Sequence, residues 1–326
     1  MGVTTQIWVI TCVVILGLFV FDFFAHVRVA HEPTFRESAS WSAFYIGLAV
    51  AFGFLIWWRW GSEYGGEYFA GYVTEKALSV DNLFVFTVIM ASFAVPRIYQ
   101  QKLLLIGIVM ALVMRAAFIA VGAAAINAFS WVFYIFGIFL VLTAVKLARE
   151  SGHEKEAEQE RDSRIVAFVG RFLPLSDDYD RDRFLTKIDG RRAGTPMLLA
   201  LVAIGFTDLL FALDSIPAIY GLTEEPYIVF TANAFALMGL RQLYFLIGGL
   251  LDRLIYLSVG LSLILGFIGV KLMLHALHKN TLPFINGGKY VDVPEISTAM
   301  SISVIAVILV VTTVASLIRT RGRTGA

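Results

Sequence analysis

Long apolar stretches alternate with shorter polar segments along almost the whole chain. A run of about 20 apolar residues is long enough to cross the hydrocarbon core of a membrane as a helix. The pattern therefore predicts an all-α, polytopic membrane protein with about nine transmembrane helices. The nine stretches lie near residues 6–25, 41–58, 68–95, 102–124, 127–147, 196–220, 227–250, 255–276 and 297–318.

The composition agrees with this class. The 326 residues are 58% hydrophobic and 16% charged, with a mean hydropathy of +0.77, whereas a soluble domain is about 25% charged. The single cysteine, Cys12, excludes an intramolecular disulfide and any cysteine-based zinc site. Because the first apolar stretch lacks a basic n-region and a clear cleavage site, we expect a retained helix and not a signal peptide.

The polar segments between the stretches predict the orientation in the membrane. With the N-terminus outside, only Arg59, Lys279 and Lys289 fall in outer segments. The inner segments hold most of the other Lys and Arg residues, including those between 146 and 192 and the basic C-terminal tail. Since cytoplasmic loops are enriched in basic residues, we expect the N-terminus outside and the C-terminus in the cytoplasm.

Two blocks of three stretches share features in the same order. Each block opens with an acid motif, carries Arg115 or Arg241 in its middle helix and ends its third helix with Val-Lys-Leu. The first block enters the membrane from outside and the second from inside, so the blocks are predicted to be inverted repeats, a transporter architecture. The predicted organisation is peripheral helices 1–2 at 1–67, repeat 1 at 68–147, a charged cytoplasmic loop at 148–195, repeat 2 at 196–276, and an outer loop, helix 9 and basic tail at 277–326.

Each acid motif consists of a threonine, an acid, a second acid six residues later and then a small amide or hydroxyl residue. An ionised carboxylate in hydrocarbon costs about 2.5 kcal/mol or more by insertion scales, so it usually marks an ion or proton path. Four carboxylates in two matched segments predict a cation site. The segments are Thr74-Glu75-Lys76-Ala77-Leu78-Ser79-Val80-Asp81-Asn82 and Thr207-Asp208-Leu209-Leu210-Phe211-Ala212-Leu213-Asp214-Ser215.

Helical geometry limits how these acids can act together. On a straight helix, six residues place the two acids of one motif about 120° apart and about 9 Å apart along the axis. Either the helix is broken between them, or the two acids face different partners. Glu75, Ser79 and Asn82 share one helical face, and Asp208 and Ser215 repeat that spacing.

The candidate metal ligands are carboxylate, amide and hydroxyl oxygens, and no histidine or cysteine lies near the motifs. Such hard ligands suit Mn²⁺, Mg²⁺ or Ca²⁺ better than Cu⁺ or Zn²⁺, and they do not separate the first three ions. Asn233 either adds an amide oxygen or makes an interhelical hydrogen bond. The predicted ligands are Glu75, Asp81, Asn82, Asp208, Asp214 and Ser215, with Ser79 and Asn233 as further candidates.

Four bases within the predicted helices balance the charge of the acids: Lys76, Arg115, Arg241 and Lys271. We expect the two arginines to be counter-ions and helix braces and not ligands. Four carboxylates and four bases also fit a purely structural ion-pair network, and a proton or anion path is a third interpretation. Asp22, near the end of the first stretch, is expected to have an interfacial role. The loop 148–195 is interpreted as a solvated connector, with a metal-sensing role open for its acidic cluster.

At these motifs the chain resembles the TerC family of bacterial membrane proteins, and most closely its Alx-like branch. The resemblance covers roughly residues 10–320 and is carried by Glu75–Asn82 and Phe211–Ala218, with Gly239–Arg241 in support. It implies a manganese exporter of the bacterial inner membrane. The implied metal site consists of Glu75, Asp81, Asp208 and Asp214, with Asn82 and Ser215 beside them.

One position departs from the family pattern. Relatives often carry a glutamate three residues before the acid that matches Asp208, and Gly205 stands there in this chain. We expect the loss of that carboxylate to change the metal preference or the coupling.

The sequence thus predicts a transporter that exports Mn²⁺ by alternating access. Proton counter-transport is a further hypothesis, because crowded carboxylates have raised pKa values and can exchange metal for protons. A Ca²⁺ or Mg²⁺ transporter has the same features, and a non-transporting accessory for metal loading or membrane insertion is another alternative.

No His-Glu-x-x-His or Gly-x-Ser-x-Gly pattern occurs, so we expect no enzyme activity. The expected partners are the divalent cation, the lipid bilayer and protons, with no nucleic acid and no cofactor besides the transported Mn²⁺.

Overall fold

The computed structural model describes residues 1–27, 31–129, 131–150, 166–176, 178–188, 190–247, 256–280, 282–283 and 285–321. Within these ranges the side chains of His26, Val27, Asp81, Glu150, Ile247 and Arg321 are not described. The side chain of the candidate ligand Asp81 therefore lies outside what the structure describes, as do the acidic segment 151–165 and Asp177.

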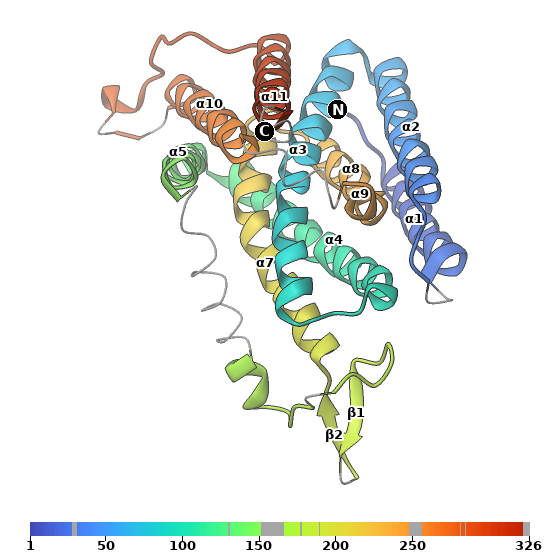
Figure 1. Cartoon of the computed structure of the whole chain (residues 1–326). Helices are drawn as coiled ribbons and strands as arrows, with labels where there is room; N and C mark the ends of the chain where they lie inside the picture. Colours follow the sequence, from blue (N-terminus) through green and yellow to red (C-terminus); the bar gives the residue numbers. More distant parts are fainter. Residues whose placement is uncertain are drawn as a thin grey trace.

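The described residues are almost entirely helical and form one bundle, with a β-hairpin projecting from one end (Figure 1). The membrane-length part contains α1 (Thr5–Asp22), η1 (Phe23–Val27), α2 (Phe35–Trp60), α3 (Ser62–Ser92), α4 (Arg97–Ala128), α5 (Val132–Glu150), α7 (Pro196–Tyr220), α8 (Pro226–Leu237), α9 (Leu240–Ile247), α10 (Leu257–His278) and α11 (Thr298–Arg321). The remaining elements are β1 (Leu185–Ile188), β2 (Arg191–Gly194) and η3 (Asn286–Gly288).

Eight helical segments of the described residues are long and apolar enough to cross a membrane. They match eight of the predicted stretches, with α8 and α9 together forming one segment, and they confirm an all-α polytopic membrane protein. The remaining stretch is α3, which is less apolar because it carries the first acid motif. Both α3 and α7 are continuous through their acid motifs. A helix broken between the two acids is therefore the wrong alternative.

Burial separates an inner group of helices from an outer group. In the apolar window of α8 and α9, 83% of the residues are buried, against 22% in α1 and in α11. The outer helices α1, α2 and α11 carry many exposed apolar side chains, which suit contact with lipid tails. The polar groups of the inner helices are consequently kept away from the bilayer.

Each inner helix of residues 68–147 packs against a helix of residues 196–276. α3 packs against α8 and α4 against α7, while α5 packs against α10. α3 also contacts α7, and α4 contacts α8. Exchanging the helices of 68–147 with those of 196–276 maps this set of contacts onto itself, as an internal two-fold axis would. The inverted orientation of the two blocks stays a prediction.

The predicted span at 227–250 is two helices and not one. The backbone turns at Met238 and Gly239, where Gly239 has φ +75°. Lys76 Nζ on α3 donates hydrogen bonds to the carbonyl oxygens of Ala236 (2.9 Å) and Met238 (3.4 Å). These carbonyls lie at the C-terminal end of α8, where helical donors are missing and positive charge is favourable. Lys76 thus binds a helix end, which differs from the predicted balancing of the motif acids.

The described part of the loop 148–195 contains a structure that the sequence pattern did not predict. β1 and β2 pair antiparallel, and the hairpin leads directly into α7. Tyr179 donates to the carbonyl of Phe93 (2.6 Å), and Lys102 pairs with Asp182 (2.6 Å). These contacts attach the segment to the turn between α3 and α4, so it is more than a solvated connector.

Replacement of Gly239 by alanine should destabilise the protein more than the same change at Gly287. Both glycines have positive φ values, +75° and +65°, but a Cβ at 239 would lie 2.9 Å from Tyr45 Cβ, whereas a Cβ at 287 meets nothing within 4 Å. The positive φ alone costs an alanine about 1–2 kcal/mol at either position. With the clash added, Gly239→Ala should lower the free energy of unfolding by about 2–4 kcal/mol. Equilibrium unfolding in detergent measures both variants, and equal losses would contradict a close approach at 239.

Candidate functional site: a buried carboxylate and arginine network

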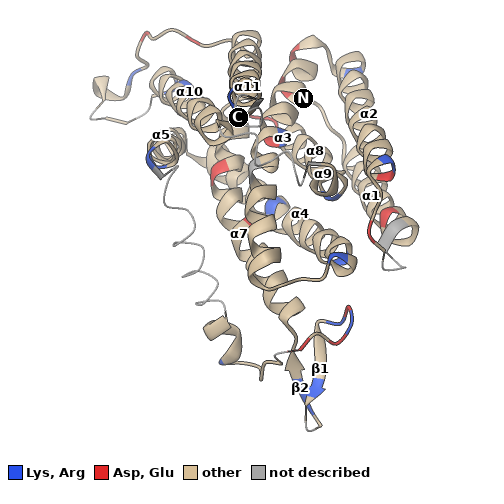
Figure 2. Ribbon diagram, in the orientation of Figure 1, with Lys and Arg blue, Asp and Glu red and all other residues tan. Residues whose placement is uncertain are grey.

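Along the helices, Lys, Arg, Asp and Glu residues occur at only a few positions (Figure 2). Arg115 of α4 lies at the centre of the bundle and has no exposed surface. Its guanidinium pairs with Asp208 of α7 through Nη2 (3.0 Å) and Nε (3.3 Å), and Nη1 pairs with Glu75 of α3. Nη1 also donates to Asn233 Oδ1 of α8 (2.9 Å) and to Ser215 Oγ of α7 (3.2 Å).

The network joins both acid motifs from four helices. Glu75, Asp208, Asn233 and Ser215 are at most 2% exposed, so the charged groups contact one another inside the protein and not water. A fork of guanidinium donors facing a carboxylate is the strongest common ion-pair geometry. Two carboxylates and one guanidinium leave one net negative charge among the described side chains of this network.

Several buried polar atoms near this network have no hydrogen-bond partner among the side chains and backbone that the structure describes. Glu75 Oε2, Thr74 Oγ1 and Thr207 Oγ1 are buried and unpaired, as is the amide nitrogen of Asn233. Ser79 Oγ lies 3.5 Å from Glu75 Oε1, at the limit of a hydrogen bond. Buried polar atoms are normally satisfied, so these unpaired oxygens are unused acceptors next to the motif acids.

Asp214 does not join the Arg115 network. Thr143 of α5 donates to Asp214 Oδ1 (3.0 Å). Asp214, Asn82, Thr143, Lys146 and Ser215 line a cavity of about 160 Å³ between α3, α5, α7 and α10. Because Ser215 also accepts a hydrogen bond from Arg115, the cavity lies directly against the network.

The described residues contain no group of three or more His, Cys, Asp or Glu side chains that could hold a metal ion. The structure instead divides the predicted ligands between two neighbouring places. Glu75, Asp208, Ser215 and Asn233 surround Arg115, whereas Asp214 and Asn82 line the cavity. The two acids of the second motif therefore face different partners, as helical geometry allows.

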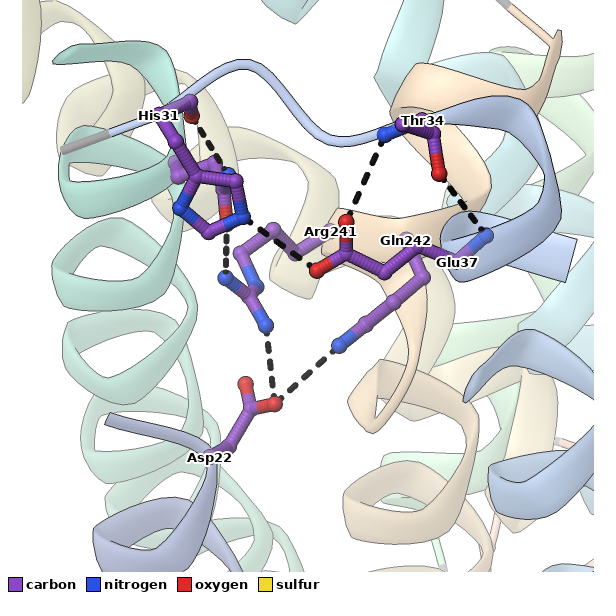
Figure 3. A network of polar contacts seen from close by, with 7 residues as sticks. Asp22, His31, Thr34, Glu37, Arg241 and Gln242 are labelled. Atoms are coloured by element: carbon purple, nitrogen blue, oxygen red, sulfur yellow. Dashed lines mark hydrogen bonds and ion pairs between the residues drawn. The ribbon is translucent and has the colours of Figure 1, made fainter. Parts of the chain in front are cut away.

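The other buried arginine, Arg241 of α9, belongs to a separate network (Figure 3). It donates to Asp22 Oδ1 (2.8 Å) and to Gln101 Oε1 (2.6 Å). Gln242 (3.1 Å) and Tyr45 (2.9 Å) also donate to Asp22. These contacts tie α1 to α4 and α9, and they do not involve the acid motifs. Asp22, the last residue of α1, is 6% exposed and forms a buried ion pair with Arg241. Its expected interfacial role stays a prediction.

The fourth predicted base, Lys271 of α10, lines a second cavity of about 630 Å³. This cavity lies at the end of the bundle where α3 begins and where α7, through a short loop, meets α8. Under the predicted orientation, that end is extracytoplasmic. Its lining includes Glu63, Glu67, Glu224, Glu225 and Glu295, and we call it the acidic vestibule.

Gly205 packs against α4. A Cβ at this position would lie 2.3 Å from Met110 Cε, so a longer side chain needs Met110 to move. The position sits three residues before Asp208 on the same helix, which places it about one turn from the network.

A comparison with protein families shows which family the chain belongs to. The family described as the integral membrane protein TerC family matches residues 60–324. The protein belongs to the TerC family. No solved structure gives a significant match.

Relatives within or near this family cover much of the chain. An uncharacterized membrane protein of Mycobacterium tuberculosis is 54% identical over 324 residues, which are 99% of this chain and 82% of that protein. Alx of Escherichia coli, a putative membrane-bound redox modulator, is 36% identical over 293 residues, 87% of this chain and 85% of that protein. The thylakoid membrane protein TERC of Arabidopsis thaliana is 42% identical over 243 residues, 74% of this chain and 62% of that protein.

The structure of this TerC-family protein adds site residues that the motifs did not contain. Thr143 and Lys146 line the cavity beside Asp214. Their i, i+3 spacing puts them on one face of a helix that is largely apolar before its last turn, and this signal was present in the sequence. No comparable pattern marked Gln101 or Tyr45. Gln101 accepts a hydrogen bond from Arg241, 140 positions away, and Tyr45 donates to Asp22 of α1, so both contacts depend on how separate helices pack.

Loss of the Asp22 carboxylate should be costly because it leaves Arg241 buried without its counter-ion. We expect Asp22→Asn to lower the free energy of unfolding by about 3–5 kcal/mol. The matched control is Glu32→Gln, which breaks the exposed Arg97–Glu32 pair (2.9 Å) and should cost less than about 1 kcal/mol. Chemical unfolding in detergent compares them, and equal effects would refute a structural role for the Asp22–Arg241 pair.

Glu224 in the vestibule gives a pH-dependent prediction. Hydrogen bonds from His275 and Lys279 lower the pKa of Glu224 from 4.5 to about 2. A carboxyl group with a lowered pKa stabilises the folded state above its unfolded pKa, and it loses this effect as the pH falls. The stability difference between wild type and Glu224→Gln should therefore shrink as the pH falls from 4.5 toward 2. A pH-independent difference would contradict this pairing.

Proposed function

We propose that this TerC-family protein is a divalent-cation transporter of the bacterial inner membrane that exports Mn²⁺ from the cytoplasm. The proposed function is transport and not enzymatic catalysis. The N-terminus lies outside and the C-terminus in the cytoplasm in this proposal, which follows the distribution of basic residues.

The observation that carries the proposal is the convergence of both acid motifs on one buried positive charge. Asp208 lies midway along α7, and Glu75 and Arg115 are similarly far from the ends of α3 and α4. Ionisable groups at membrane depth are expensive and mark ion pathways. Substrate sites of repeat-built transporters lie near the midplane where the repeats meet, and this network joins helices from both blocks.

The surrounding cavities support a path for a cation. Asp214, Asn82, Thr143 and Ser215 offer oxygen ligands in the cavity next to the network. The lining of the acidic vestibule holds five glutamates and one lysine, Lys271. Such an excess of negative charge in a cleft concentrates cations, here at the predicted outer end. Glu67 of the vestibule and Glu75 lie on the same helix, about 12 Å apart along its axis.

Manganese is proposed on two grounds. The available ligands are carboxylate, amide and hydroxyl oxygens, which suit Mn²⁺, Mg²⁺ and Ca²⁺. The resemblance of the motifs to Alx-like exporters favours Mn²⁺ among these ions. A redox function, suggested by the name of the Escherichia coli relative, has less support, since the lone Cys12 cannot form a disulfide within the chain.

A flux measurement in liposomes tests the proposal. Purified protein should move Mn²⁺ down an imposed gradient, and Asp214→Asn and Glu75→Gln should each reduce the flux about tenfold or more, since charge-assisted contacts are worth about 1.5–3 kcal/mol. Excess Mg²⁺ and Ca²⁺ serve as competitors. Flux that Mg²⁺ or Ca²⁺ suppresses at low concentration would make one of these ions the substrate.

The matched control is Asp22→Asn, which removes a buried, arginine-paired acid outside the site. It should lower the yield of folded protein and leave the flux per folded molecule close to that of wild type. Folded wild-type protein without flux above empty liposomes would favour a non-transporting accessory. Proton counter-transport is tested in the same vesicles, because flux that is indifferent to an imposed pH gradient would exclude it.

A further inference from the structure

We propose that Arg115 is a tethered cation that competes with the transported ion for Glu75 and Asp208. This inference rests on the proposed function and states how the same site is emptied. The guanidinium group now occupies the position between the two carboxylates where a transported cation would be expected to bind. The predicted role of Arg115 as a passive brace does not include this competition.

The contacts of Arg115 are those of a substitute for a metal ion. Its donors contact two carboxylates, an amide oxygen and a hydroxyl oxygen, from Glu75, Asp208, Asn233 and Ser215. All four were candidate metal ligands on sequence grounds. An ion that binds these oxygens must displace the guanidinium, because one oxygen cage cannot hold both cations at contact distance.

The charge of the network also favours exchange. With Arg115 in place, the two carboxylates keep one uncompensated negative charge among the described side chains. A divalent cation would neutralise both carboxylates. The unpaired oxygens Glu75 Oε2, Thr74 Oγ1 and Thr207 Oγ1 remain as acceptors that the guanidinium does not use.

The cavity of about 160 Å³ provides the space that an exchange needs. Ser215 lines this cavity and accepts a hydrogen bond from Arg115. An ion held by Asp214 and Asn82 in the cavity would therefore be adjacent to the guanidinium before it displaces any bond. The flexible arginine side chain can then withdraw from the carboxylates and later return.

Arg241 shows what a structural arginine looks like in the same protein. It is also buried and paired with a carboxylate, but the cavity beside it is only about 10 Å³. Its partners include Gln101 and Asp22, which lie outside the acid motifs. It therefore provides a control that is matched in residue type, burial and pairing.

The physical advantage of a tethered cation is that the carboxylates are never left unpaired. Buried carboxylates without a counter-charge are strongly unfavourable, and in a membrane this cost would hold the metal in place. A returning guanidinium supplies the counter-charge when the ion leaves. Arg115 would thus weaken equilibrium binding and speed release.

The experiment measures Mn²⁺ binding to detergent-purified wild type, Arg115→Gln and Arg241→Gln by titration calorimetry and by the shift in thermal unfolding. Arg115→Gln should bind Mn²⁺ about tenfold or more tightly than wild type, a change well above the resolution of such titrations. Its flux in liposomes should fall, since release loses its counter-ion. Arg241→Gln should keep an affinity within about twofold of wild type.

A second variant covers the case in which Arg115→Gln does not fold. Arg115→Lys keeps the charge but loses the planar fork that spans two carboxylates, so it should bind Mn²⁺ more tightly than wild type. Affinity equal to or below that of wild type in a folded Arg115 variant would overturn the proposal. If wild-type flux and its loss in Asp214→Asn are nevertheless observed, only the tethered-cation inference fails and the transport function stands. Absence of Mn²⁺ binding in every folded variant would overturn both.

Discussion

The centre of this protein depends on the pairing of one buried guanidinium with two buried carboxylates. Packing among apolar helices in lipid gives little preference for one register over another, because lipid tails are as apolar as the side chains. The contacts of Arg115 with Glu75, Asp208 and Asn233 fix α3, α4, α7 and α8 relative to one another. Removal of any partner leaves a charge or an amide without compensation, so the network constrains how these four helices pack.

The two arginines of the proposed repeats have similar positions in the sequence and different environments. Arg115 pairs with acids of both motifs, whereas Arg241 pairs with Asp22 of the peripheral helix α1 and contacts the first block only through the neutral Gln101 of α4. The packing pairs exchange as an internal two-fold axis requires, but the polar contacts do not follow that symmetry. A single central site on a two-fold axis can be asymmetric in this way when one block supplies the counter-ion and both supply the oxygens.

Much of the fold could be predicted from the sequence, because apolar stretches of sufficient length have one stable outcome in a bilayer. The acids and arginines of the centre were also identifiable, since charge within such stretches is rare. Their partners were not, because a pair such as Asp22 and Arg241 joins residues 219 positions apart. The contact of Lys76 with the end of α8 and the β1–β2 hairpin were missed for a related reason: each depends on tertiary packing and not on local periodicity.

The interruption between α8 and α9 affects how the two helices are coupled mechanically. A tilt of α9 is transmitted poorly to α8 across Gly239, whereas one continuous helix would transmit it along its whole length. Asn233 lies on α8 and Arg241 on α9. The turn at Gly239 therefore separates the helix that holds Asn233 against the central charge from the helix that holds Arg241 against Asp22, so the two buried arginines are not carried by one continuous helix.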